Sequence, residues 1–506
     1  MAKAPKKNSG NSILRAVVVA MSFLLQLGWI LMWILEWNRY SACISVLTGL
    51  LAVLVVLKLY SKQTNGAFKL PWIMLIMAMP VMGLSLYLMT QGAMTPRSIH
   101  RRLLEMKAKN APHLVQKEPV TETMPPEMGN LARYLNRWEG MPVWTDTSAQ
   151  YYSETLDALQ DMKRDLERAE KYIFMEYFIL QDGEAFRQIR EILERKAAQG
   201  VEVRLMYDDL GSIGTTSWRY ARELNSRGIR CRSFNPALPF LNLFLNNRDH
   251  RKMTVIDGKV GYTGGYNLAD EYFHYTRPYG HWKDVGLRLE GKGVRNLTAT
   301  FLELWNLNRP GEENPAFYLN ISHGMESDCL VQPFGDSPLD GERTAENVYL
   351  NLINQAGNHI WIMTPYLIIT DEMSRSLELA AKRGVDVRII TPGVPDKKTV
   401  WALTRSYYPQ LIRQGVKIFE YTPGFCHGKM AVCDGHMAII GTSNLDFRSL
   451  YLHFENNVML YGGAAVARME ADFQAMFPKC RQIQEVSPNV TLRTWQCVLR
   501  LFAPLL

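Results

Sequence analysis

Two histidine–lysine pairs are the residues of this sequence whose types and spacing could carry out chemistry. They lie in two copies of the pattern His-x-Lys-x-x-x-x-Asp, His250-Arg-Lys252-Met-Thr-Val-Ile-Asp257 and His427-Gly-Lys429-Met-Ala-Val-Cys-Asp434. A histidine titrates near neutral pH, so it can act as a nucleophile or as a general acid and base. A lysine gives phosphoryl oxygens a fixed positive charge, whereas its ammonium group repels a metal cation. The pairs therefore predict a phosphate site that uses no metal and no cofactor.

Each motif begins an apolar run that is typical of a β-strand, on which alternate side chains share a face. His250 and Lys252 are therefore expected to point the same way, and so is the second pair. Asp257 and Asp434 belong to the candidate catalytic set because they complete the motifs. However, they have the opposite parity, and a glycine follows each of them. Since Asp-Gly between two strands is typical of a hairpin turn, we expect both aspartates to hold turns rather than to react.

A corner of small residues follows each predicted turn. The two corners are Gly264-Gly265-Tyr266-Asn267 and Gly441-Thr442-Ser443-Asn444. The amides of Asn267 and Asn444 could both donate to the phosphate that the histidines face. A single His-x-Lys would mean little, but two copies with the same turn and the same corner indicate a duplicated site.

The elements that must position the motifs also occur twice. Strands are predicted at Tyr172–Leu180 and His359–Ile369, each between helical segments, and a Gly-Val-acid-Val-Arg run follows at Gly200 and again at Gly384. The two motif histidines are 427 − 250 = 177 residues apart, which sets the size of the repeat. Alternating strands and helices predict βαβ units. We therefore predict an α/β fold of two duplicated domains, each a mixed, mostly parallel sheet flanked by helices.

Three apolar runs precede the repeats, at Ala16–Leu35, Ala42–Leu57 and Leu70–Met89. A helix needs about 20 apolar residues to span a bilayer. The first run is too long for a signal peptide and no small-residue cleavage site follows it, so a retained anchor is favoured. Pro80 predicts a kink in the third run. These runs predict two or three transmembrane helices and a multi-pass protein of the cell membrane, with the side of the catalytic domain left open.

The chain is therefore expected to have five parts. These are a transmembrane anchor at 1–92, a linker at 93–145, the two repeats at 146–325 and 326–488, and a C-terminal amphipathic helix at 489–506. This last helix suits either a membrane interface or packing on the soluble core.

The net charge indicates the class of partner, and the cysteine content argues against two kinds of structural site. The formal net charge of +8 suits an anionic partner, either a nucleic acid or an acidic membrane surface. The seven cysteines are scattered without a CxxC pair, which argues against a disulfide framework and against a cysteine zinc site.

The longer runs around the motifs resemble the phospholipase D superfamily and, more closely, bacterial cardiolipin synthases of the phospholipase D type. The resemblance extends from about Pro71 to the C-terminus. The runs that carry it are Asn247-Arg-Asp-His-Arg-Lys252, Gly264-Gly-Tyr-Asn-Leu-Ala-Asp-Glu-Tyr272, Trp282-Lys-Asp284, Gly441-Thr-Ser-Asn-Leu-Asp-Phe-Arg-Ser449 and Arg500-Leu-Phe-Ala-Pro-Leu-Leu506. One departure is His453, which stands where the family has asparagine.

The resemblance implies that both motifs share one site and that a phosphatidyl group is transferred reversibly from one phosphatidylglycerol to another, giving cardiolipin and glycerol. Family precedent makes His250 the nucleophile that forms a phosphohistidine and His427 the acid and base, although the sequence itself is symmetric. It also implies a supporting carboxylate for each histidine, Asp284 in the first half and Glu455 in the second. The expected partners are phosphatidylglycerol and other anionic membrane lipids, and the oligomeric state stays open.

Several alternatives remain at this point. A phospholipase D-type hydrolase, or a transferase that uses phosphatidylethanolamine as donor or acceptor, fits the same motifs. A nuclease is disfavoured by the apolar anchors and by the apolar stretch Ala237–Leu245 before the first motif. A non-enzymatic scaffold would predict decayed motifs, whereas every motif histidine and lysine is present.

Overall fold

The computed structural model describes residues 41–91, 97–116, 120–217, 219–235, 246–307, 314–486 and 489–505, with positions 21, 24, 27 and 28. The chain divides into two compact units. The helical unit comprises Met1–Pro96, Ala237–Asn246 and Cys497–Leu506, and the motif unit comprises Arg97–Pro236 and Asn247–Gln496. The apolar runs predicted at Ala16–Leu35 and Ala237–Leu245 lie outside the described residues, apart from isolated positions of the first.

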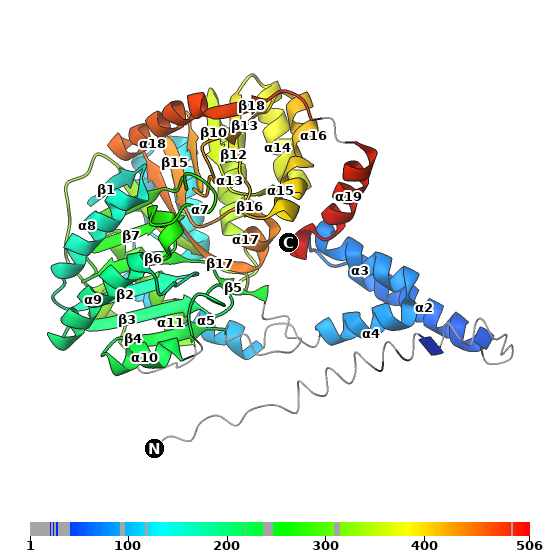
Figure 1. Cartoon of the computed structure of the whole chain (residues 1–506), viewed down its shortest axis with the longest axis horizontal. Coiled ribbons are helices and arrows are strands. Elements are labelled where there is room, and N and C mark those ends of the chain that lie inside the picture. The colour runs from blue at the N-terminus through cyan, green and yellow to red at the C-terminus, as the bar shows by residue number, and fades with distance from the viewer. Residues whose placement is uncertain are drawn as a thin grey trace, which may run out of the picture. The chain divides into compact units, whose positions relative to one another are not determined.

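The first repeat of the motif unit contains a seven-stranded sheet in the order β1-β8-β7-β6-β2-β3-β4 (Figure 1). Its strands are β1 Thr147–Tyr152, β2 Tyr172–Tyr177, β3 Glu202–Asp208, β4 Arg230–Phe234, β6 Lys252–Ile256, β7 Val260–Gly264 and β8 Gly286–Gly291. The helices are α8 Thr155–Glu167, α9 Glu184–Ala198, α10 Tyr220–Ser226, α11 Val294–Leu307 and α12 Ala316–Leu319, with a short 3-10 turn, η3, at Asp270–Phe273.

The second repeat contains a larger sheet in the order β18-β13-β12-β10-β14-β15-β17, with β9 also paired to β17. Its strands are β9 Leu330–Asp336, β10 His359–Met363, β12 Asp386–Pro392, β13 Lys417–Tyr421, β14 Met430–Cys433, β15 Met437–Gly441, β17 His453–Tyr461 and β18 Cys480–Ile483, and a small separate sheet joins β11 Leu367–Ile368 to β16 Leu445–Asp446. The helices are α13 Thr344–Gln355, α14 Asp371–Lys382, α15 Lys398–Arg405, α16 Tyr408–Arg413, α17 Phe447–Tyr451 and α18 Gly463–Met476.

The predicted α/β fold with mixed sheets is confirmed, but the prediction of mostly parallel sheets is wrong. Within the two large sheets of the described chain, consecutive strands of one repeat pair in parallel only across β2–β3–β4 and β10–β12–β13. The remaining strands of each repeat pair antiparallel. The motif strands β6 and β14 each form a hairpin with the next strand, β7 or β15, and each also lies antiparallel to a strand of the parallel group, β2 or β10. Gly200 and Gly384, predicted to end helices, have φ of 91° and 92°, which favours glycine.

A single hydrophobic core joins the two repeats. It includes Phe174 and Val255 from the first sheet together with Ile362 and Val432 from the second. Helix α11 contributes Phe301, whose ring stacks on Phe174 with 4.6 Å between the ring centroids. Burial of this apolar surface holds the repeats as one body, so a site can be built from both.

The segment predicted as a linker at 93–145 contains helices that belong to the motif unit. They are α5 Arg97–Asn110, α6 Val120–Thr123 and α7 Pro126–Glu139, with a 3-10 turn, η1, at Ala111–His113. Lys107 of α5 contacts the carboxylates of Glu139 and Asp340, each at 2.9 Å. This half-buried lysine ties α5 to α7 and to the second repeat.

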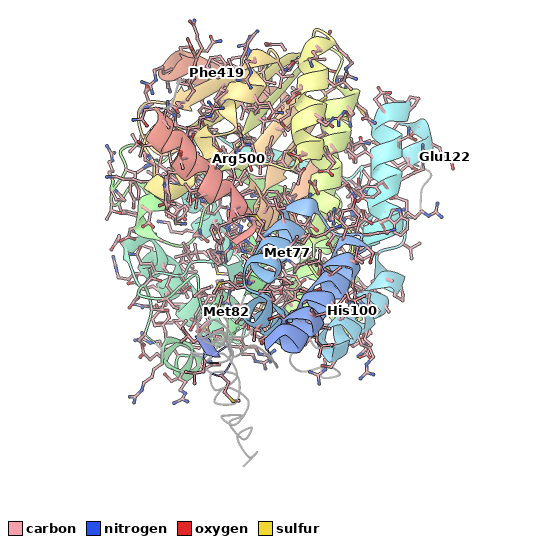
Figure 2. All side chains as sticks on the ribbon, turned by 90° about the vertical axis from the view of Figure 1, so that its right-hand side faces the viewer. Met77, Met82, His100, Glu122, Phe419 and Arg500 are labelled. Atoms are coloured by element: carbon pink, nitrogen blue, oxygen red, sulfur yellow. The ribbon has the colours of Figure 1, made fainter. Side chains whose placement is uncertain are left out.

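The helical unit contains α2 Ser41–Tyr60, α3 Gly66–Ala78 and α4 Pro80–Gln91. The third apolar run is broken at Met79 into two helices rather than kinked, and Met77 and Met82 lie on either side of the break (Figure 2). A Cβ at Gly83 would lie 2.7 Å from the Cα of Ile76, so glycine permits the two helices to pack closely. In the described part of the chain, no helix is both long and apolar enough to cross a membrane, so the spans predicted at 42–57 and 70–89 are not found.

The predicted C-terminal helix is present as α19 Val490–Leu501, followed by a 3-10 turn, η5, at Ala503–Leu505. Val490, Trp495 and Val498 on this helix are exposed, whereas the amide of Gln496 donates to the carbonyl of Ala402 at 3.0 Å. The helix therefore presents apolar side chains to solvent and also contacts the second repeat.

Candidate active site

The two motif histidines lie immediately before matching hairpins. His250 precedes β6 and its hairpin with β7, and His427 precedes β14 and its hairpin with β15. The four motif histidines and lysines are all at least nine-tenths buried. Lys252 Nζ donates to the carbonyl oxygen of His250 at 2.6 Å, and Lys429 Nζ lies 2.9 Å from the ring nitrogens of His427. Each lysine therefore stays beside its own histidine, as expected from strand parity.

Short backbone pairings cross between the repeats at the motifs. Strand β5 (Arg248–Asp249) from the first repeat pairs in parallel with β17 of the second, and His250 N donates to Phe454 O at 2.9 Å. In the reciprocal pairing, His427 N donates to Lys283 O at 2.7 Å. Each histidine is thus held by a backbone hydrogen bond to the other repeat.

The supporting carboxylates cross over in the same way. Glu455 of the second repeat accepts from His250 Nδ1, with its oxygens at 2.9 and 3.0 Å, and Asp284 of the first repeat accepts from His427 Nδ1 at 2.6 Å. The sequence assigned one carboxylate to each half, and each in fact serves the histidine of the opposite half. Because a carboxylate holds Nδ1 in both rings, we expect Nε2 to be the reacting nitrogen, and in His427, Lys429 Nζ lies 2.9 Å from it.

Burial and neighbouring cations hold both histidines neutral in the ligand-free protein. Burial, followed by the charge of Lys252, lowers the pKa of His250 well below its usual value, and Lys429 and His427 act in the same direction. Burial and Lys429 lower the pKa of His427 to about 4. Since groups of the second motif act on His250, the two motifs face one space.

Burial also brings the pKa values of the two motif lysines close to neutral pH. Burial lowers the pKa of Lys252 to about 7 and that of Lys429 to about 8, although Glu455 and Asp284 oppose the shift. The charge of Lys429 also lowers the pKa of Lys252. An anion that binds between them would reverse these shifts by stabilising both ammonium groups.

The two carboxylates differ in their surroundings. Glu455 accepts hydrogen bonds from the hydroxyls of Ser449 and Thr442 as well as from His250, yet burial raises its pKa well above the usual value. Asp284 is equally buried, but the adjacent His427 and Lys429 outweigh that burial and lower its pKa. Asp284 is therefore the carboxylate that stays ionised.

The motif aspartates hold the turns. Asp257 and Asp434 have φ of 54° and 51°, in the left-handed region, at the tips of the two hairpins. The Asp257 carboxylate accepts from three consecutive backbone N–H groups at the start of β2, at 2.7 to 2.9 Å. Asp434 accepts three at the start of β10, all at 2.7 Å, and these donors outweigh partial burial to lower its pKa. Each aspartate therefore fixes its hairpin to the neighbouring strand.

The two corner asparagines are engaged differently. Asn267 accepts from Ile179 N at 2.9 Å and donates to the Tyr272 hydroxyl at 2.8 Å, so its amide braces the corner. The Asn444 side chain hydrogen-bonds to Asp446, while its buried Oδ1 has no hydrogen-bond partner among the described residues. An unpaired amide oxygen can only accept a hydrogen bond, so it does not support the expected donation from Asn444 to phosphate.

Sequence reasoning did not assign roles to the residues that surround the histidine rings. Phe178 and His453 lie beside His250, with ring centroids 4.9 and 5.4 Å away. Tyr272 and Trp282 lie beside His427, at 5.3 and 5.5 Å. Tyr272, Trp282 and the Glu455 donors Thr442 and Ser449 all occur in the extended runs around the motifs, and that position was their only signal.

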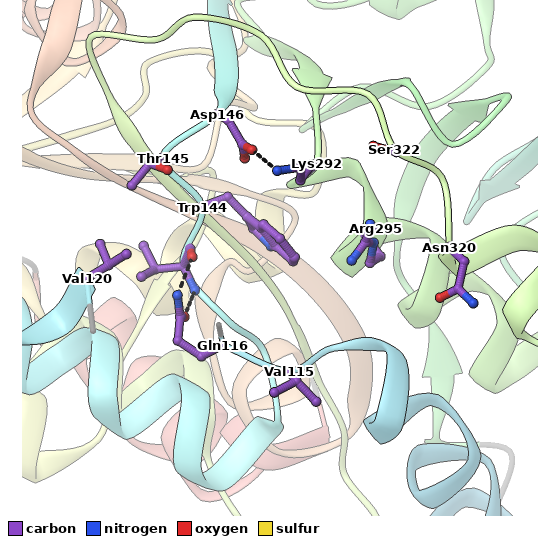
Figure 3. A pocket seen from close by; sticks show the side chains of 11 residues that line it. Val115, Gln116, Val120, Trp144, Thr145, Asp146, Lys292, Arg295, Asn320 and Ser322 are labelled. Atoms are coloured by element: carbon purple, nitrogen blue, oxygen red, sulfur yellow. Dashed lines mark hydrogen bonds and ion pairs between the residues drawn. The ribbon is translucent and has the colours of Figure 1, made fainter. Parts of the chain in front are cut away.

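A cavity of about 400 Å³ lies elsewhere in the motif unit (Figure 3). Its lining includes Trp144, Asn320 and Arg295, and the side chains of Lys292 and Asp146 form an ion pair at its edge. None of the motif histidines or lysines lines it, so it is separate from the site described above.

A family model described as "Cardiolipin synthase, PLD-like domain" matches residues 162–305 and 349–477, which together make up more than half of the chain. The chain belongs to this family. Both matched segments contain one complete motif and one of the two crossed carboxylates.

Relatives of this phospholipase D-like family match nearly the full chain. A cardiolipin synthase of Halalkalibacterium halodurans is 33% identical over 475 residues, which cover 91% of this chain and 93% of that protein. A protein of Streptococcus mutans described as uncharacterized is 38% identical over 457 residues, covering 89% and 99%. Among solved structures, phosphatidylserine synthase of Haemophilus influenzae aligns with a TM-score of 0.56 at 14% identity, over 74% of this chain and 98% of that one. That likeness shows the shared fold.

Proposed function

We propose that this protein is a cardiolipin synthase that transfers a phosphatidyl group between two phosphatidylglycerol molecules, releasing glycerol. The observation that carries the proposal is the pair of crossed histidine–carboxylate contacts, which brings two histidines and two lysines to one site. Relatives named cardiolipin synthases, at 32 to 39% identity, support the choice of lipid substrate.

In the first step, His250 Nε2 attacks the phosphorus of one phosphatidylglycerol. The bond from phosphorus to the headgroup glycerol oxygen breaks, and protonated His427 gives that oxygen its proton. Glycerol leaves, and the phosphatidyl group stays on His250 as a phosphohistidine.

In the second step, neutral His427 takes the proton from a free headgroup hydroxyl of a second phosphatidylglycerol. The hydroxyl oxygen attacks phosphorus, the phosphorus–nitrogen bond to His250 breaks, and cardiolipin is formed. His250 returns to its neutral form and His427 ends protonated, ready for the next donor. Each histidine keeps one task throughout, and the same steps run in reverse if glycerol attacks cardiolipin.

The surroundings of the two histidines support this order. Ionised Asp284 accepts from His427 Nδ1 and favours a positive charge on that ring, as an acid and base requires. Burial lowers the pKa of His250 and keeps its ring neutral, and if Nδ1 donates to Glu455, then Nε2 is the unprotonated nitrogen that attacks phosphorus. The phosphodiester charge then raises the pKa of His427 from its ligand-free value and keeps both lysines cationic.

Contact with the membrane is assigned to the helical unit. Leu47, Leu50, Leu54 and Leu57 of α2 are exposed, and Met74 and Met77 of α3 are exposed as well. We propose that this apolar surface enters the membrane that holds the lipid substrates. The finer assignment, a multi-pass protein of the cell membrane, is a proposal that rests on the apolar runs of the sequence.

The test is to express the protein in a bacterium that lacks cardiolipin and to measure its lipids by mass spectrometry. The wild-type chain should restore cardiolipin, the His250→Ala variant should not, and a His113→Ala variant should match the wild type. His113 is half-buried, lies outside the motifs and hydrogen-bonds to the Asn320 side chain, so it is a suitable control.

Other outcomes identify the alternatives. Accumulation of phosphatidic acid without cardiolipin would show that water is the acceptor and that the protein is a hydrolase. Incorporation of label from phosphatidylethanolamine would show a different donor. Equal cardiolipin from the wild type and the His250→Ala variant would contradict the proposed site.

A further inference from the structure

A second cluster of ionisable side chains lies outside the motif residues. It consists of Glu154, immediately before α8, His274, immediately after η3, and His281, immediately before Trp282. The Nε2 atoms of His274 and His281 lie 3.5 and 3.6 Å from the same carboxylate oxygen, Glu154 Oε2. The two imidazole rings stack with 4.7 Å between their centroids.

These separations fit the edges of a metal coordination shell. A zinc ion bound at about 2.0–2.1 Å in tetrahedral geometry separates its ligand atoms by about 3.3 Å. The observed separations are close to this value and are longer than a good hydrogen bond. One ligand atom from each of the three residues lies within 4.8 Å of the other two, so a single ion could contact all three.

The orientation of the histidines supports a metal site over a simple ion pair. His281 Nδ1 is 2.9 Å from the Tyr421 hydroxyl, which directs Nε2 of that ring toward Glu154. Such an outer hydrogen bond is typical of metal-ligating histidines. Nδ1 of His274 is buried without a hydrogen-bond partner in the described part of the chain, and its Nε2 has only the 3.5 Å contact with Glu154. A buried ring that forms no good hydrogen bond indicates a missing ligand.

We propose that Glu154, His274 and His281 bind a divalent transition-metal ion, with water completing the shell. Two imidazoles and one carboxylate form a ligand set that zinc and its neighbours accept. The other nearby histidine–carboxylate group, His250 with His453 and Glu455, belongs to the site already described and lies beside the Lys252 ammonium, which opposes a cation.

The ion would join the two ends of one loop. His274 and His281 bracket residues 275–280, and His281 is followed by Trp282, which contacts His427, and by Asp284, which accepts its Nδ1 hydrogen bond. Binding would therefore fix this loop to the start of α8 and steady the segment that orients His427. The ion is a structural clip and takes no part in phosphoryl transfer.

The test is a zinc titration of the metal-stripped, full-length protein in detergent, in competition with a chromophoric chelator. One zinc ion should bind, and His274→Ala or His281→Ala should each weaken its affinity at least tenfold. Tyr421→Phe should weaken it less, because it removes only the orienting hydrogen bond. His323→Ala is the matched control, because His323 contacts Glu290 at 3.3 Å without a second histidine, and it should bind zinc like the wild type.

Two further measurements identify the ligands. X-ray absorption at the zinc edge should show nitrogen and oxygen neighbours and no sulfur at about 2.3 Å. Hydrogen exchange of residues 275–280 should slow with zinc in the wild type and not in His281→Ala. Absence of zinc binding, a sulfur shell, or affinity that depends on His453 rather than on His274 would overturn the proposal.

Discussion

The two repeats differ at the corner that faces each carboxylate. In the first repeat the corner position is Gly265, where a Cβ would lie 2.0 Å from Asp284 Oδ1. In the second repeat the matching residue is Thr442, whose hydroxyl donates to Glu455. The first corner leaves room for Asp284 to lie against its backbone. The second corner donates a hydrogen bond to Glu455.

This difference teaches how a duplicated scaffold can give two like histidines different tasks. Asp284 depends on His427 and its own neighbour Val285 N for hydrogen bonds, and the adjacent positive charges lower its pKa. Glu455 has two hydroxyl donors, yet burial dominates and raises its pKa. Similar backbones therefore place an ionised carboxylate behind one reactive ring and, behind the other, a carboxyl group whose ionisation is opposed by burial.

The largest expected difference between the repeats comes from neutralising each carboxylate. Asp284→Asn should lower kcat by about 10³–10⁴-fold, because the amide cannot stabilise the protonated form of His427 and favours the wrong tautomer. Glu455→Gln should cost about 10–100-fold, since burial already disfavours its charge. Steady-state kinetics in mixed micelles measure both. Equal losses would contradict the division of tasks.

The matched corner residues should give the next largest difference. Gly265→Ala should lower kcat by about 10²-fold, because the added Cβ displaces Asp284 from His427. Thr442→Ala removes one of three donors to Glu455 and should cost only a few-fold. Circular dichroism on both variants serves as the folding control, and a larger loss in Thr442→Ala than in Gly265→Ala would break the comparison.

The lysines should make activity fall on the alkaline side. Lys252 and Lys429 are cationic below their pKa values of about 7 and about 8, and they lose that charge as pH rises. The ligand-free enzyme then attracts the phosphodiester less, so kcat/KM should begin to fall above pH 7 and should fall by up to about a hundredfold per pH unit above pH 8, where both lysines lose their charge. Lys252→Arg keeps its charge, so only the fall due to Lys429 should remain, at about tenfold per pH unit above pH 8. A flat profile from pH 7 to 10 would show that the lysine charges do not matter.

The smallest effect on catalysis is expected at the turn aspartates. Asp257→Asn and Asp434→Asn each weaken the three-fold contact with backbone N–H groups and should lower the free energy of unfolding by about 1–3 kcal/mol. Thermal denaturation measures this loss. The kcat of the folded protein should stay near the wild-type value, and a loss comparable to Asp284→Asn would assign the aspartates to the chemistry instead.

Local features of the site could be predicted from the sequence. Period-two alternation placed His250 and Lys252 on one side, and Asp-Gly after an apolar run predicted the turn at Asp257, because both depend on neighbours a few residues apart. The sequence order of helices and strands likewise predicted β2, β3, β10 and β12.

Features that depend on the packing of the repeats could not be predicted in this way. Asp284 follows His250 by 34 residues and Glu455 follows His427 by 28, so the sequence favoured pairing within each half. The crossed pairing of His250 with Glu455 arises because β5 pairs with β17 of the other repeat. Strand β5 has only two residues, Arg248 and Asp249, so no sequence pattern predicts its pairing. The extent of parallel pairing was overestimated for a related reason. The βαβ pattern accounts for three strands per repeat, and it does not predict the antiparallel hairpins that contain the motifs.

The central claim is that the two histidines of one site have different tasks, and trapping the covalent intermediate tests it most directly. His427→Asn and His250→Asn proteins would be mixed with radiolabelled phosphatidylglycerol, quenched in alkaline denaturant to preserve phosphohistidine, and analysed by peptide mass spectrometry. The account predicts a phosphatidyl adduct on the His250 peptide of His427→Asn and none on His250→Asn. An adduct on His427, or on neither histidine while the wild type forms cardiolipin, would contradict it.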